Sequence, residues 1–128
     1  MKTNPLDTAP LYVLKRLPSD TESQLNISVQ IDEKHRVFEG HFPDFPILPG
    51  VYLIQMVKDS LNTFLSDNFW MKTASSVKYL KPVEPGKNKS LRLEITWTET
   101  EDSLLVSASS FLEDATVNFK FKGEFVKS

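Results

Sequence analysis

Several short segments of the chain alternate between apolar and polar residues. Within residues 21–32, an apolar side chain occupies every second position from Leu25 to Ile31. Residues 90–97 and residues 116–125 alternate in the same way. A period of two places the apolar side chains on one face of an extended chain, so these three segments predict half-buried β-strands.

Other segments predict strands from weaker patterns. Residues 75–80 are followed by a Pro- and Gly-containing turn at 82–86, and residues 104–112 are rich in apolar side chains. Residues 11–17 are mostly apolar and fit either a strand or a short helix. Val37–Phe38 is predicted to continue the preceding strand after a turn.

Only one segment has helical periodicity. Between Val51 and Phe64, apolar residues recur every three or four positions, and Pro49-Gly50 precedes them as a start signal. We expect this helix to end near residues 66–68. Because the strands after it follow at short spacing without further helices, the pattern favours an α+β fold, with one helix against a curved antiparallel sheet.

The length and composition fit a single globular domain. A chain of 128 residues and 14.6 kDa buries about two-thirds of its surface on folding, and 40% of the residues are hydrophobic. No repeat or linker divides residues 1–128. Residues 1–10, which include Pro5 and Pro10, are predicted to be a loose lead-in to this domain.

The charge and the missing residue types exclude several function classes. A formal net charge of −2 gives no general attraction to nucleic acid. The absence of cysteine removes disulfides, thiolate nucleophiles and cysteine-based metal sites. The chain begins without a signal-peptide pattern and has no apolar run long enough for a bilayer, so we expect a cytoplasmic protein without a membrane partner.

Residues 39–50 form the most unusual segment of the sequence. Three prolines in seven residues disfavour both a helix and a central strand, and they stiffen the loop that contains His41. A stiff loop holds a side chain at low entropic cost, so His41 is a candidate functional residue; the alternative is a buried histidine bonded to the backbone. The second histidine, His35, lies in a charged turn and is expected to be a solvated loop residue.

Read as a whole, the segment Gly40–Val51, GHFPDFPILPGV, resembles the GHFPxxPIxPGV signature of the β-hydroxyacyl-acyl-carrier-protein dehydratases of the FabZ type, to which FabA is a near relative. Residues 77–86, VKYLKPVEPG, resemble a second family motif, and the likeness extends from about residue 11 to the C-terminus. The resemblance implies a hot-dog fold, in which a curved antiparallel sheet wraps a central helix. It also implies a dimer with active sites between subunits.

The resemblance assigns roles to two residues. His41 is the base that removes the α-proton of a thioester, and Gly50 at the helix start offers its backbone N–H to the thioester carbonyl. The physical chemistry agrees, because a helix N-terminus presents unpaired N–H groups and a positive dipole end to a developing enolate. Histidine titrates near neutral pH and is a competent base.

An apolar substrate tunnel is the expected place for the acyl chain. Its candidate lining residues are those of the motif loop and the first turn of the helix, and for each of them a place in the core is the alternative. They are Phe42, Phe45, Ile47, Val51 and Ile54.

The sequence departs from the family at the second catalytic position. The resemblance places an acid fourteen residues after the motif histidine, and this chain has Gln55 there, with Asp59 one turn later. A glutamine amide cannot deliver a proton at neutral pH. Three interpretations stay open: Asp59 supplies the acid with Gln55 orienting substrate or water, His41 and Gln55 suffice for a slow elimination, or a paralogous partner chain supplies the missing acid.

The leading hypothesis is therefore a lyase that converts a 3-hydroxyacyl thioester on acyl carrier protein to the trans-2-enoyl thioester, in fatty-acid or polyene- or polyketide-type biosynthesis. The alternatives are a non-catalytic hot-dog subunit, which binds acyl carrier protein or pairs with an active paralogue, and a hot-dog thioesterase. We expect a homodimer or a heterodimer, no metal, and no cofactor beyond the phosphopantetheine arm of the carrier. Residues 72–92, with six basic residues against Glu84, either receive the acidic carrier or simply face solvent.

Overall fold

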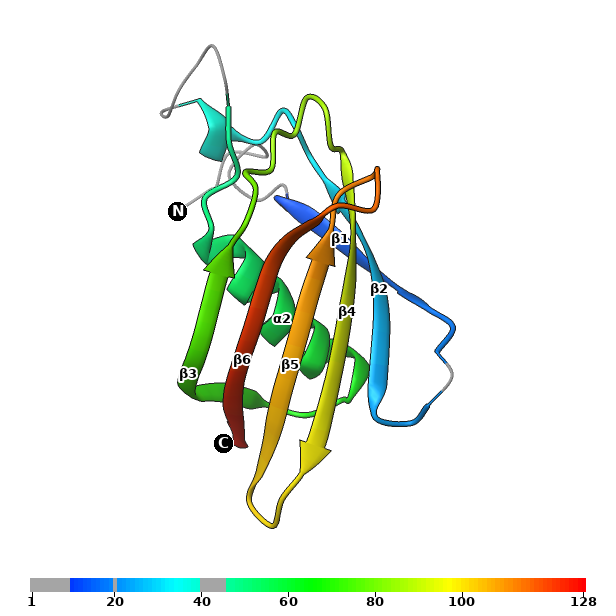
Figure 1. Ribbon diagram of the computed structural model, residues 1–128, viewed down its shortest axis with the longest axis vertical. Coiled ribbons are helices and arrows are strands. Elements are labelled where there is room, and N and C mark those ends of the chain that lie inside the picture. The colour runs from blue at the N-terminus through cyan, green and yellow to red at the C-terminus, as the bar shows by residue number, and fades with distance from the viewer. Residues whose placement is uncertain (1–9, 20, 40–45) are drawn as a thin grey trace, which may run out of the picture.

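The computed structural model describes residues 10–19, 21–39 and 46–128 and forms one antiparallel sheet with a helix across it (Figure 1). The strands are β1 Tyr12–Leu17, β2 Gln24–Ile31, β3 Phe69–Tyr79, β4 Ser90–Glu99, β5 Ser103–Phe111 and β6 Val117–Lys127. The helices are the short 3₁₀ helix η1, Arg36–Phe38, and the α-helix α2, Val51–Phe64.

The six strands pair in the order β1-β2-β4-β5-β6-β3, and every neighbouring pair is antiparallel. Strands β1 and β3 therefore form the two edges of the sheet. Helix α2 runs along one face of the sheet (Figure 1). The predicted α+β fold, with one α-helix in the described part of the chain packed against an antiparallel sheet, is confirmed.

Most predicted elements are present, and three predictions are wrong in detail. Helix α2 ends at Phe64 rather than near residues 66–68. Strand β3 begins at Phe69 rather than at residue 75. Buried and exposed residues do not alternate along it, because it has two register shifts against β6 and is exposed over most of its length. Val37–Phe38 belongs to η1 and not to a strand. Half-buried His35 caps η1, because its Nδ1 accepts a hydrogen bond from the backbone N–H of Val37 at 3.0 Å.

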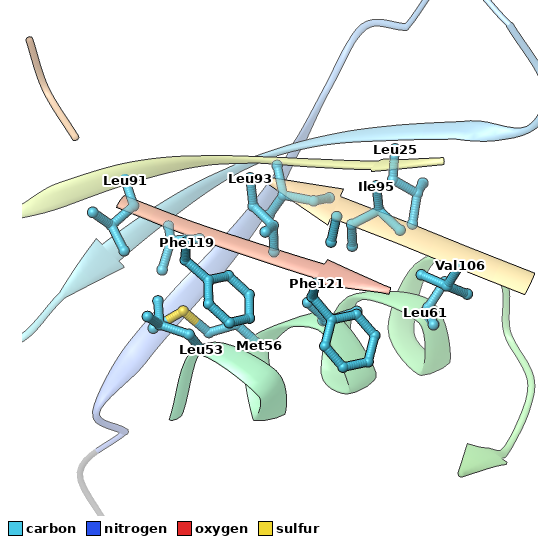
Figure 2. Packing of buried hydrophobic residues seen from close by; sticks show 14 of the residues in the cluster. Leu25, Leu53, Met56, Leu61, Leu91, Leu93, Ile95, Val106, Phe119 and Phe121 are labelled. Carbon is cyan, nitrogen blue, oxygen red and sulfur yellow. The ribbon is translucent and has the colours of Figure 1, made fainter. Parts of the chain in front are cut away.

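The core lies between α2 and the sheet. Helix residues Leu53, Met56, Val57 and Leu61 are buried, and they pack with strand residues that include Phe119 (Figure 2). Each fully buried side chain of this size contributes about 1.5–3 kcal/mol to folding. Burial of this one stripe orients the helix, so its opposite face is left for other contacts.

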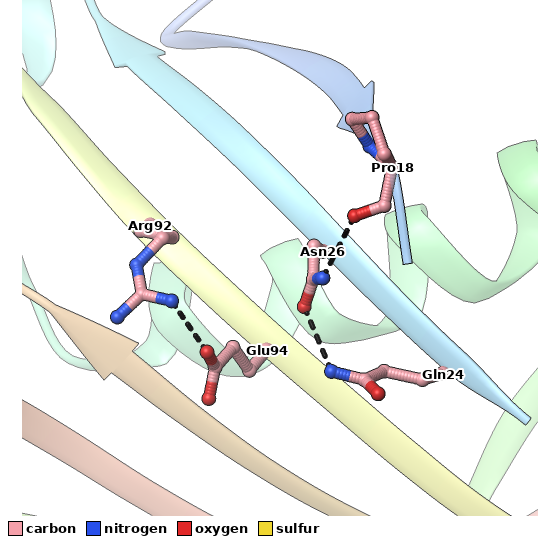
Figure 3. A network of polar contacts seen from close by, with 5 residues as sticks. All are labelled: Pro18, Gln24, Asn26, Arg92 and Glu94. Atoms are coloured by element: carbon pink, nitrogen blue, oxygen red, sulfur yellow. Dashed lines mark hydrogen bonds and ion pairs between the residues drawn. The ribbon is translucent and has the colours of Figure 1, made fainter. Parts of the chain in front are cut away.

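The face of the sheet away from the helix is polar. On β2, the Asn26 amide donates to the Pro18 carbonyl at 2.9 Å and accepts from the Gln24 amide at 3.0 Å (Figure 3). On β4, Arg92 pairs with Glu94 (Figure 3). No helix within residues 10–19, 21–39 and 46–128 is long and apolar enough to cross a membrane.

Gly123 on β6 is required by packing, and Gly86 provides a matched control. A Cβ at Gly123 would lie 2.6 Å from the Thr73 carbonyl oxygen and 2.6 Å from Cζ of Phe121, whereas a Cβ at Gly86 would meet nothing within 4 Å. We expect Gly123→Ala to lower the free energy of unfolding by about 1–3 kcal/mol. Gly86→Ala should change it by less than about 0.5 kcal/mol. Urea denaturation of both variants checks this, and equal stabilities would contradict it.

Candidate functional site

Helix α2 begins without a cap at Gly50. Gly50 has no side chain to cap the helix, and the first turn contains no acidic residue. The first backbone hydrogen bonds run from Tyr52 to Pro49 at 3.1 Å and from Leu53 to Gly50 at 3.0 Å. Within the described residues, the N–H groups of Gly50 and Val51 therefore have no acceptor, and they are available to a negatively charged oxygen.

The two sequence motifs lie side by side at this helix start. The backbone N–H of Leu48 donates to the carbonyl of Val83 at 2.9 Å. The ring of Tyr79 covers Gly50 so closely that a Cβ there would lie 2.5 Å from its Cε1 atom. Glycine is therefore the residue that allows Tyr79 to close over the first turn of the helix.

A pocket of about 350 Å³ opens between the two motif segments. It is lined by Ile47, Leu48, Gly50 and Leu53 on one side and by residues 79–83 on the other. Among the predicted lining residues, Ile47 contributes to it. Ile54 is half-buried and packs against the core instead, and Val51 is 64% exposed. Tyr79 and Leu80 also line the pocket, and the downstream motif was the signal for them.

Three predicted site residues, His41, Phe42 and Phe45, lie outside the described residues. Their roles stay predictions.

The Tyr79 side of the pocket is held by β6. The carbonyl of Asn118 accepts hydrogen bonds from the backbone N–H groups of Leu80, at 2.9 Å, and Lys81, at 3.3 Å. The rings of Tyr79 and Phe119 stack with centroids 5.6 Å apart. These contacts fix residues 79–81 relative to the core, so the wall of the pocket is part of the folded sheet.

Gln55 and Asp59 lie one turn apart and are hydrogen-bonded to each other. The Gln55 Nε2 group donates to Asp59 Oδ1 at 2.7 Å, and Gln55 is otherwise exposed. The hydroxyl of Tyr12 on β1 donates to the second carboxylate oxygen, Oδ2. Asp59 is thus half-buried, and each of its carboxylate oxygens accepts a hydrogen bond.

Tyr12 was not predicted as a site residue, because no motif within residues 11–17 indicates a functional side chain. Burial raises the pKa of its hydroxyl above the ordinary value, and the hydrogen bond to Asp59 and the negative charge there raise it further. The Tyr12 hydroxyl therefore stays protonated and remains a hydrogen-bond donor throughout the physiological range.

The six basic residues of segment 72–92 fall into two groups in the structure. Three of its six basic residues form ion pairs with carboxylates: Lys87 with Glu84, Lys89 with Glu33, and Arg92 with Glu94. Lys72, Lys78 and Lys81 form no ion pair within the described residues.

Lys78 instead belongs to a basic hollow on the polar face of the sheet. It lies directly opposite Lys120 in the register of β3 and β6, and both line this hollow with Lys122, Ser107 and Ser109. Like charges placed opposite each other are unfavourable without a counter-charge. Lys120 and Lys122 were not predicted, because they are distant from residues 72–92 in sequence.

Comparison with known proteins gives a consistent match. A family model described as the ApeI dehydratase, ApeI-like, matches residues 18–121. The 3-hydroxyacyl-[acyl-carrier-protein] dehydratase FabZ of Fusobacterium nucleatum is 26% identical over 115 residues, covering 84% of this chain and 79% of that protein. The FabZ of Syntrophobacter fumaroxidans is 25% identical over 116 residues, covering 84% and 78%.

A solved structure extends this likeness to the fold. A chain of the dehydratase heterocomplex ApeI:P from Xenorhabdus doucetiae is 27% identical and superposes with a TM-score of 0.76, covering 94% of this chain and 100% of that one. The hot-dog fold inferred from the GHFPDFPILPGV segment is thereby confirmed.

The raised pKa of Tyr12 predicts a specific loss of stability at high pH. An unfolded tyrosine ionises near pH 10, while Tyr12 in the folded protein holds its proton to higher pH. Its contribution to stability is therefore complete below about pH 10 and falls as the pH rises above that value. We expect Tyr12→Phe to be less stable than the parent by about 1 kcal/mol near pH 8, and to lose less stability between about pH 8 and pH 11.

Chemical denaturation at the two pH values measures both effects. All other tyrosines and lysines are common to the two proteins, so the difference between them isolates Tyr12. Parallel pH profiles would show that the hydroxyl is not protected by the fold.

Proposed function

Because this chain belongs to the ApeI-like dehydratase family, we propose that it catalyses the dehydration of a 3-hydroxyacyl thioester carried by acyl carrier protein, giving the trans-2-enoyl thioester and water. The observation that carries the proposal is the uncapped start of α2 at Gly50, which borders the pocket formed by both motif segments. Such a helix start stabilises the negative oxygen of an enolate. The pathway is fatty-acid synthesis or a specialised polyene- or polyketide-type synthesis.

The reaction divides into two proton movements and one bond cleavage. His41 takes the α-proton of the thioester, and the resulting enolate oxygen accepts a hydrogen bond from the Gly50 N–H. The enolate then re-forms the carbonyl, the Cβ–O bond breaks, and the leaving hydroxyl takes a proton to depart as water. The His41 imidazolium formed in the first step holds a proton that it can return in the last step. The reaction therefore needs no additional acid to balance its protons.

The substrate arrives on the phosphopantetheine arm of the carrier, and we propose no other cofactor. Acyl carrier proteins are acidic, which makes a basic surface the natural docking place. Lys78, Lys120 and Lys122 provide such a surface, and so does Lys81 at the edge of the pocket. These four residues support a carrier as the partner.

A second candidate function is a subunit that needs a paralogous partner. Two observations favour it: Gln55 stands where the family has an acid, and the similar Xenorhabdus protein is part of a dehydratase heterocomplex. Tyr79 and Leu80 at the pocket are 53% and 50% exposed, and Val51 at the helix start is 64% exposed, which gives an apolar surface suited to a second chain. We propose a homodimer or a heterodimer in which this surface is covered.

A thioesterase remains the third candidate and has less support. A carboxylate that attacks a thioester or activates water must present a lone pair of one oxygen to the thioester or the water, and each hydrogen bond it accepts occupies one of these sites. Both oxygens of Asp59 accept hydrogen bonds, from Tyr12 and from Gln55.

Purified chain should convert a 3-hydroxyacyl carrier thioester to the enoyl product. We expect His41→Ala to slow this conversion by about 10²–10⁴-fold, the range for the loss of a general base. Mass spectrometry of the acyl carrier protein measures the loss of water, and a thiol reagent measures hydrolysis in the same sample. His35→Ala is the matched control and should retain the activity. Release of free thiol without enoyl product would instead indicate a thioesterase.

The Gln55→Glu variant separates the first two candidates. It restores the acid of the family pattern, so it should raise the rate if this chain is a subunit whose partner supplies the acid. If the chain works with Gln55 as it stands, the rate should be unchanged or lower. The assay is repeated with an added paralogous dehydratase, and activity that appears only in the mixture supports the heterodimer.

A further inference from the structure

Three side chains from two distant parts of the chain form one hydrogen-bonded cluster on the polar side of α2. Tyr12 comes from edge strand β1, and Gln55 and Asp59 come from α2. Asp59 accepts from the Tyr12 hydroxyl through Oδ2 and from the Gln55 amide through Oδ1, at 2.7 Å. The cluster runs from the half-buried Tyr12 outward to the exposed Gln55.

The charge of Asp59 decides which way the Gln55 amide faces. An ionised carboxylate only accepts hydrogen bonds, so the amide must turn its Nε2 group toward Asp59 and its Oε1 atom away. An asparagine or a water in the same place would accept either orientation. Tyr12 strengthens the constraint, because its hydroxyl occupies the other carboxylate oxygen and limits rotation of that group.

We propose that Asp59, held by Tyr12, is a positioning residue that fixes the polarity of the Gln55 amide, so that Gln55 Oε1 accepts a hydrogen bond from the β-hydroxyl of the substrate. The inference rests on the proposed dehydration. In this arrangement Gln55 touches the leaving group and does not protonate it. The hydrogen bond fixes the rotation of the hydroxyl, which leaves a lone pair of its oxygen directed at the proton donor.

The alternative, in which Asp59 itself protonates the leaving hydroxyl, fits the geometry less well. Both carboxylate oxygens already accept a hydrogen bond within this chain, Oδ2 from Tyr12 and Oδ1 from Gln55, and each bond occupies one of the lone-pair sites that a substrate hydroxyl would otherwise use. Breaking the Tyr12 bond would leave a half-buried hydroxyl without a partner, which costs free energy. Asp59 therefore acts through Gln55.

A double-mutant cycle distinguishes positioning from direct catalysis. We expect Asp59→Asn to lower kcat by about tenfold, as for loss of one well-placed hydrogen bond, with KM unchanged within about threefold. Gln55→Ala should lower kcat at least as much. The double variant should be no slower than Gln55→Ala within about threefold, because Asp59 has no remaining group to position. Multiplied losses in the double variant would overturn the proposal.

Two further variants complete the series. Tyr12→Phe removes one hydrogen bond to Asp59, so its kcat should lie between those of the parent and Asp59→Asn. Asp67→Asn is the matched control, since Asp67 pairs with Lys127 at 3.3 Å just beyond the C-terminal end of α2 and its loss should leave kcat unchanged. Equal losses in Asp59→Asn and Asp67→Asn would show only a general effect of charge and would overturn the proposal.

Side-chain amide NMR gives a readout that does not depend on turnover. The two Nε2 protons of Gln55 should have well-separated shifts in the parent protein, and these should converge in Asp59→Asn. Unchanged amide signals would overturn the proposal even if the enzyme is active. Absence of dehydration in the parent, alone and with a paralogous chain, would overturn the proposed function and this role with it. An active parent with multiplied losses would overturn the role alone.

Discussion

Helix α2 buries one apolar stripe, formed by Leu53, Met56, Val57 and Leu61, against the sheet, and this contact determines where the other groups of the site can lie. The burial sets the rotation of the helix about its axis. The start of the helix thereby borders the pocket that residues 79–83 line from the other side, and the Gln55 side chain faces solvent. A rotation that exposed the stripe would cost several buried side chains at once, so the orientation is strongly fixed.

The start of the helix serves packing and chemistry through the same residue. Because Gly50 has no Cβ, the ring of Tyr79 can close over the first turn. Because Gly50 also has no capping side chain, its N–H has no acceptor among residues 10–19, 21–39 and 46–128. A serine or aspartate there would satisfy the helix better by the usual capping rules and would also collide with Tyr79. The helix thus begins in a less stable way that leaves donors at the pocket.

The polar face of α2 combines local spacing with a distant contact. Gln55 and Asp59 meet because residues four apart share a face of any α-helix. Tyr12 reaches the same carboxylate because β1, at one edge of the sheet, brings its side chain to this face of α2. Near the start of the same helix, the exposed side chains of Val51, Tyr79 and Leu80 leave an apolar surface.

The sequence by itself determined the start of α2, the alternating strands β2, β4 and β6, and the family, because these depend on local periodicity and on one uninterrupted motif. The resemblance of the motif to the dehydratase family also identified Gly50 and Gln55 as candidates, and Asp59 as the acid one turn later. Only the tertiary structure placed Tyr12 on Asp59, Tyr79 over Gly50, and Lys120 opposite Lys78. Each of those contacts joins residues at least 29 positions apart, where the pairing of strands decides which side chains meet and no local pattern records it.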